Sequence, residues 1–111
     1  MLLKSGDKVL IVHRRLFEND RGRYFVGTIE EYEGGVASVT GYTFVREEMG
    51  GEILRKGDRR TKIVPISSGT FLVYRLPAEF AVDETKIQPQ ENRLMLLDGH
   101  GFEMNLSEHG F

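Results

Sequence analysis

The chain has 111 residues, of which 40% are apolar and 29% are charged, and its formal net charge is −2. These values are typical of one soluble globular domain with a modest core, and the absence of cysteine excludes disulfides and thiolate chemistry. No apolar run is long enough to cross a bilayer and no signal-peptide pattern opens the sequence, so we expect a single cytoplasmic domain over 1–111 with no membrane partner. The chain is mildly basic before residue 77 and acidic after it.

Three β-strands are expected in the first 46 residues, at 8–16, 23–32 and 36–46, because runs rich in β-branched and aromatic residues alternate with turn residues. The first run is apolar on both faces at its start, which predicts a strand buried in the middle of a sheet. The dipeptide Gly34-Gly35 separates the second run from the third. Two glycines allow the positive φ angles of a primed hairpin turn, so these two strands should pair antiparallel.

Gly27 and Gly41 lie inside expected strands, where glycine loses side-chain packing and costs backbone entropy. A geometric requirement therefore has to explain them. Strong bending or a β-bulge, as where a small barrel closes, is the favoured explanation. The close approach of a ligand is the alternative.

The most polar stretch of the chain, 46–62, follows the third strand. We expect a charged excursion over 46–60, either a short hairpin turned by Gly50-Gly51 or a flexible segment. A fourth strand is expected at 62–66 and a fifth at 70–76. The fourth contains Pro65, which cannot donate to a ladder, so it should be an edge strand or carry a bulge.

The C-terminal section predicts additional β-structure. A short strand is possible around 86–88, and a clear hairpin follows, with strands at 93–97 and 102–106. The predicted fold class is therefore all-β. We expect a small, strongly bent barrel over 7–76 and a β extension, including the additional C-terminal hairpin, over 77–111.

A spaced series of glycine, aromatic, apolar and acidic positions runs through the second expected strand: Gly22, Phe25, Gly27, Ile29, Tyr32 and Glu33. The stretch IVPISSGTFLVY, at 63–74, adds two apolar strands around Ser68-Gly69. Over about residues 7–76 the chain resembles the two motifs of the Sm-like proteins, a family of SH3-like small barrels, with Ser68-Gly69 at the place of their Arg-Gly. The resemblance implies a strongly bent five-stranded barrel, with the charged excursion as its variable loop.

The resemblance does not extend to the RNA pocket. Sm-like proteins read a base with an Asn after the second strand and with the Arg of Arg-Gly. This chain has GGVA at 34–37 and Ser68 at those places, and neither supplies an amide or a guanidinium. A shared fold therefore does not imply a shared function.

Metal binding and catalysis are not predicted. The three histidines, His13, His100 and His109, lack the close-spaced ligand pairs that zinc sites use. No nucleophile motif, zinc-protease motif or phosphate loop occurs, and no base can be named for the Ser67-Ser68-Gly69 turn. We expect no enzyme activity and no cofactor.

Basic residues suggest a nucleic-acid contact as an alternative function. They crowd the excursion and the start of the fourth strand: Arg55, Lys56, Arg59, Arg60 and Lys62. A second basic group flanks the first loop beside Phe17 and Tyr24, and such neighbours can hold a single strand by phosphate contact and stacking. It consists of Arg14, Arg15, Arg21 and Arg23. The sequence pI of about 5.9 and the acidic C-terminal section argue against it.

The leading interpretation is a non-enzymatic Sm-like binding or assembly module whose ligand is not assigned. In Sm-like rings the fourth strand of one subunit pairs with the fifth strand of the next. An open apolar edge is a hazard for a monomer, so we expect a homo-oligomer formed by strand-edge pairing. The apolar residues of these two strands are Ile63, Val64, Ile66, Phe71 and Val73. The rival is a monomer whose edge is covered by its own C-terminal hairpin at 93–106.

Overall fold

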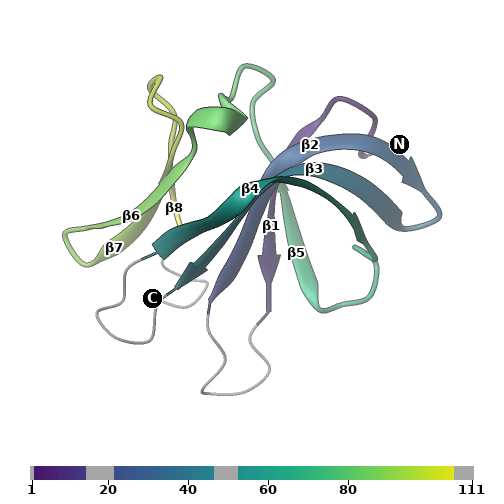
Figure 1. Cartoon of the computed structure of the whole chain (residues 1–111), viewed down its shortest axis with the longest axis horizontal. Helices are drawn as coiled ribbons and strands as arrows, with labels where there is room; N and C mark the ends of the chain where they lie inside the picture. Colours follow the sequence, from purple (N-terminus) through teal and green to yellow (C-terminus); the bar gives the residue numbers. More distant parts are fainter. Residues whose placement is uncertain (1, 15–21, 47–52, 107–111) are drawn as a thin grey trace.

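The computed structural model describes residues 2–14, 22–46 and 53–106 and is shown in Figure 1. Over these ranges the regular structure consists of eight β-strands and one 3₁₀ turn, so the predicted all-β class is confirmed. The strands form two antiparallel sheets. No helix in this part of the chain is long and apolar enough to cross a bilayer.

The larger sheet contains five strands in the spatial order β4-β3-β2-β1-β5. They are β1 (Lys8–His13), β2 (Arg23–Glu33), β3 (Val36–Arg46), β4 (Ile53–Val64) and β5 (Phe71–Arg75). β4 and β5 are the two edges, and no ladder joins them within the described residues. The strongly curved sheet therefore stays open and is not closed into a barrel by backbone pairing (Figure 1).

The smaller sheet has the order β6-β7-β8 and follows a short 3₁₀ turn, η1. These elements are η1 (Val82–Glu84), β6 (Lys86–Gln90), β7 (Arg93–Leu97) and β8 (Glu103–Asn105). The predicted C-terminal hairpin is confirmed as β7 and β8, and the possible short strand at 86–88 is β6.

The predicted turn between β2 and β3 is confirmed. Gly34 and Gly35 have φ angles of 57° and 82°, and they connect Glu33 to Val36, which are paired across the ladder. β1 lies between β2 and β5, and its four central residues are buried, as the two-faced apolar run predicted. β1 ends at His13, before the expected end of the run, and residues 15 and 16 lie outside the described ranges.

Gly27 and Gly41 face each other across the β2–β3 ladder. A Cβ atom on Gly27 would lie 2.5 Å from the carbonyl oxygen of Thr40, and one on Gly41 would overlap the carbonyl oxygen of Val26. The register also shifts after Gly41 on the β4 side, and Figure 1 shows β2 and β3 curving strongly along their length. The glycines are needed because two backbones approach each other closely in a curved hairpin, which agrees with the favoured explanation of bending.

The expected bounds of the fourth strand were wrong. β4 begins at Ile53 and ends at Val64, so residues 53–60 of the predicted charged excursion belong to a strand that pairs with β3. Backbone hydrogen bonds make this pairing, and an edge strand can leave its side chains in water, so a polar sequence is compatible with it. The rest of the excursion at 47–52, with Gly50-Gly51, lies outside the described residues. Pro65 follows the strand directly.

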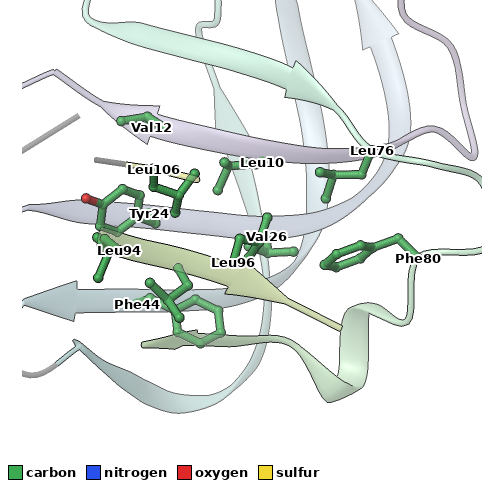
Figure 2. Packing of buried hydrophobic residues seen from close by; sticks show 11 residues of the cluster. Leu10, Val12, Tyr24, Val26, Phe44, Leu76, Phe80, Leu94, Leu96 and Leu106 are labelled. Carbon is green, nitrogen blue, oxygen red and sulfur yellow. The ribbon is translucent and has the colours of Figure 1, made fainter. Parts of the chain in front are cut away.

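Two hydrophobic cores lie on opposite faces of the larger sheet. We call the one shared by both sheets the outer core, and Figure 2 shows its side chains meeting: Leu10, Val12, Tyr24, Val26, Phe44, Leu76, Phe80, Ile87, Leu94, Leu96 and Leu106. The other, the inner core, is formed within the larger sheet: Val9, Ile11, Phe25, Ile29, Ala37, Val39 and Val64. The smaller sheet thus covers a face of the larger sheet. The described strands of the C-terminal hairpin pair with each other and with β6, and not with β4 or β5, and the rival idea of a monomer whose edge this hairpin covers stays a prediction.

A buried carboxylate ties the loop between β7 and β8 to the segment before η1. Asp98 is 3% exposed and accepts hydrogen bonds from the backbone N–H groups of His100, Phe102 and Ala81 at 2.8, 3.1 and 3.4 Å. Burial by itself would raise the pKa of Asp98, but these three donors hold it below its ordinary value. The ammonium of Lys8, on β1, donates a hydrogen bond to the backbone carbonyl of Phe80 at 2.7 Å and so connects the larger sheet to the same segment.

Candidate functional site

The basic residues that the sequence grouped lie on one strand but on both of its faces. Arg55 faces η1. The carbon of its guanidinium lies 4.5 Å from the ring centre of Tyr42, and an N–H of the same group donates a hydrogen bond to the carbonyl of Asp83 at 3.3 Å. Tyr42 donates to the Asp83 carboxylate at 2.7 Å, and this hydrogen bond raises the pKa of Tyr42. Arg59 lines the same side, in a hollow that also contains Asp83 and Glu84. These two arginines therefore already lie near acidic residues.

The other three cations, Lys56, Arg60 and Lys62, belong to the inner face of the curved sheet. Their partners across the β3–β4 ladder are Thr43, Gly41 and Val39. Directly opposed residues of antiparallel strands point to the same face, and Val39 is part of the inner core. The ammonium of Lys62 lies 5.0 Å from the ring centre of Phe25, a cation–π contact. The structure therefore divides the predicted basic cluster into two groups.

A pocket of about 270 Å³ opens on this inner face, and all five strands of the larger sheet contribute to it. We call it the inner pocket, and the side chains used below to describe it are Ile11, His13, Arg23, Phe25, Lys62 and Phe71. Ile11 and Phe25 belong to the inner core, and Phe71 packs against that core. Mixed apolar walls with a few polar groups are the usual composition of a small-molecule site.

The ladder register explains how these side chains come together. His13 is paired with Arg23 on one side and with Phe71 on the other, so the three form a row across β5, β1 and β2. Ile11 and Phe25 form part of the next row, since residues two apart on a strand share a face. The rings of His13 and Phe71 lie 5.2 Å apart with an interplanar angle of 44°.

The inner pocket is electropositive. Partial burial lowers the pKa of Lys62, and the positive charges of Arg60 and Arg23 lower it further. Within the described ranges, no ion pair joins Arg23, Arg60 or Lys62 to a carboxylate. Among the described residues no carboxylate pairs with these cations, which repel one another, and a bound anion would relieve that repulsion.

The histidines are dispersed. His13 lies in the inner pocket, whereas His100 lies in the β7–β8 loop and pairs with Glu84. His109 lies outside the described residues. In the ranges that the structure describes, no three His, Asp or Glu side chains gather as metal ligands.

The Ser67-Ser68-Gly69 turn has local hydrogen bonds. The Ser68 hydroxyl lies 2.7 Å from the hydroxyl of Thr70, and the Ser67 N–H donates to the carbonyl of Gly35 at 3.3 Å. These contacts connect β4 to β5 and hold the turn against the β2–β3 turn.

The residues predicted to line the oligomer edges occupy two kinds of surroundings. Ile63 is 76% exposed on β4. The other four are in or against the inner core of the same copy: Val64, Ile66, Phe71 and Val73. The sequence did not indicate two further exposed apolar residues, Leu54 on β4 and Leu72 on β5, which are 44% and 39% exposed. Leu54 lies outside the expected fourth strand, so the sequence offered no reason to place it on an edge. Leu72 lies inside the expected fifth strand, and the alternation of its side chains between two faces was the signal available for it.

Comparison of the chain with protein-family models, with curated proteins and with solved structures finds no match.

Proposed function

We propose that the protein is a non-enzymatic binding and assembly module whose copies associate through the β4 and β5 edges. The observation that carries this proposal is the position of both strands. Over the described ranges each is an edge of the same five-stranded sheet with no outer partner strand, and exposed large apolar side chains lie on both, Leu54 and Ile63 on β4 and Leu72 on β5. Such edges are templates for pairing with another chain.

The geometry of the edges specifies the kind of contact. Each copy offers β4 at one end of its sheet and β5 at the other, so pairing of unlike edges joins copies head to tail. A contact of this type generates a ring if the rotation closes. The resemblance to Sm-like proteins supports the same pairing of a fourth with a fifth strand. A cytoplasmic location belongs to the proposal and is supported by the cysteine-free sequence.

The test is the molar mass in solution, measured by light scattering after size exclusion. We expect the wild-type protein to be a multimer and the variant Ile63→Lys/Leu72→Lys to be a monomer, because a charge on each edge opposes strand addition. The matched control is Val36→Lys, which changes a residue beside the β2–β3 turn that is as exposed as Leu72. A monomeric wild-type protein, or equal loss of association in the control, would refute the proposal.

Truncation at Pro77 is not a suitable test. It would remove the smaller sheet and expose the outer-core side chains of β1, β2 and β3 to water. A contiguous apolar face of this kind promotes aggregation by itself. Point substitutions at the edges avoid this ambiguity.

Nucleic-acid binding is the second candidate, favoured by the row of cations on β4. A titration with short single-stranded oligonucleotides at low and high salt measures it. Charge reversal of Arg55, Arg59 and Arg60 to Glu should abolish binding, and removing any one cation that neutralises a phosphate should reduce the slope of log K against log salt by about 0.7. The control reverses Lys86 and Arg93 on the smaller sheet. No binding by the wild-type protein at low salt would eliminate this candidate.

A further inference from the structure

The inner pocket combines apolar, aromatic walls with positive charge that no ion pair compensates among the residues that the structure describes. Phe25 and Phe71 present aromatic rings from two strands on opposite sides of β1, and Ile11 lies between them on that strand. Aromatic rings favour a flat partner, which can stack on a face or pack against an edge. The walls therefore suit a planar, largely apolar group.

The charged groups lie at one side of these walls. Lys62 is held above the ring of Phe25, while Arg23 is next to His13 in the neighbouring row. Arg60 adds a third positive charge close enough to lower the pKa of Lys62. No ion pair supplies these groups with a carboxylate in the described part of the chain, so the pocket is complementary to an anion.

We propose that the inner pocket binds a small molecule made of a flat ring that carries an anionic group. The ring packs against Phe25 and Phe71, and the anion lies between the ammonium of Lys62 and the guanidinium of Arg23. Both parts of the ligand contribute to its affinity. The rings of Phe25 and Phe71 fix the orientation of the ligand, and the two cations select its charge. This site shares β4 and β5 with the proposed edge pairing, and Ile63 lines the pocket as well. The two interactions differ because the ligand contacts inner-face side chains whereas edge pairing uses backbone groups, so ligand binding is measured in proteins that keep Ile63.

The test is a titration of the full chain followed by amide NMR shifts, with 1-naphthyl phosphate, 1-naphthoate, neutral 1-naphthol and inorganic phosphate as probes. We expect saturable shifts centred on β1, β2 and the end of β4 for the two ring anions. Naphthol and inorganic phosphate should each bind at least about tenfold more weakly. Naphthol lacks the anion and its charge-assisted hydrogen bonds, and inorganic phosphate lacks the buried ring, and either loss amounts to at least about that factor. Comparison of the two ring anions distinguishes a phosphate from a carboxylate ligand.

Three variants connect the binding to the named residues. Lys62→Gln and Arg23→Gln should each weaken binding of 1-naphthyl phosphate about tenfold while leaving the weak naphthol binding unchanged. Lys86→Gln removes one positive charge from an exposed position on β6 and should leave both affinities unchanged. Circular dichroism establishes that each variant is folded. Lys62 and Arg23 are both exposed, so neither substitution should destabilise the sheet, and either variant alone suffices for the test.

The proposal is overturned if naphthol binds as tightly as the ring anions, which would make the pocket a plain apolar patch. It is also overturned if Lys86→Gln weakens binding as much as Lys62→Gln, or if no probe produces saturable shifts. Light scattering on the same samples reports edge pairing separately, so failure of one proposal does not mimic failure of the other.

Discussion

Replacing glycines in the curved β2–β3 hairpin with alanine tests the explanation of its bend. A Cβ atom on Gly27 would lie 2.5 Å from the Thr40 carbonyl oxygen and 3.0 Å from Cγ1 of Val39. The first of these contacts is to backbone, so the clash is relieved only by moving a paired strand. Overpacking of this kind costs about 1–3 kcal/mol, and we expect about 2 kcal/mol for Gly27→Ala.

Three glycine-to-alanine substitutions should differ in how much they lower the free energy of unfolding. On Gly41 the added Cβ would overlap the Val26 carbonyl and lie 2.5 Å from the Cα of Gly27, so Gly41→Ala should be the more destabilising of the two. Gly22→Ala is the control, because its Cβ would be no closer than 3.4 Å to any atom, and only to side chains. Its effect should stay within about 0.5 kcal/mol.

Thermal and urea unfolding followed by circular dichroism measure the series. In a domain of this size 1 kcal/mol corresponds to roughly 4 °C in Tm, so Gly27→Ala should lower Tm by about 8 °C and Gly41→Ala by more. An unchanged Tm for Gly27→Ala, or equal losses for all three variants, would mean that close approach of the two backbones is not what requires glycine.

Two further predictions concern the smaller sheet. Leu94→Ala removes a fully buried outer-core side chain and should destabilise by about 2–5 kcal/mol in urea unfolding, while Leu2→Ala, at an 84% exposed residue, should have little effect; similar effects of the two would contradict the packing of the two sheets. Because the pKa of Asp98 is lowered in the folded state, its stabilisation is present at pH values above the ordinary 3.8 and is lost as the pH falls through the lower folded value. Asp98→Asn should therefore lower Tm at neutral pH and reduce the further loss of Tm in acid, and an acid profile identical to that of the wild-type protein would refute a role for this carboxylate.

Local physics determines much of the larger sheet. Gly34-Gly35 predicts a primed turn because positive φ angles are easy only for glycine, and β3 then has the predicted bounds. The continuous apolar run of β1 predicts a strand buried on both faces because no other position removes it from water, and both neighbours of β1 are indeed strands. The alternation of residues 102–106 likewise predicts a strand with one buried side, whereas β7 buries three consecutive residues, Leu94, Met95 and Leu96.

The bounds of β4 depend on tertiary structure. Residues 55–60 carry no apolar side chain, so no hydrophobic period marks them as a strand. They are held by backbone hydrogen bonds to β3, and these bonds depend on a neighbouring strand with an open edge and not on the side chains themselves. For the same reason the split of the basic residues between two faces is decided by the ladder register.

The inner pocket is also a product of tertiary structure. Its side chains come from five strands that are far apart in the sequence, and only the curvature of the sheet brings His13, Phe25, Lys62 and Phe71 to one place. The sequence by itself determined the residue types, the strand alternation and the glycine turn, because these follow from local preferences. Which cations share the inner face, and which apolar side chains line the inner pocket, was decided by register and curvature, since both depend on contacts between distant segments.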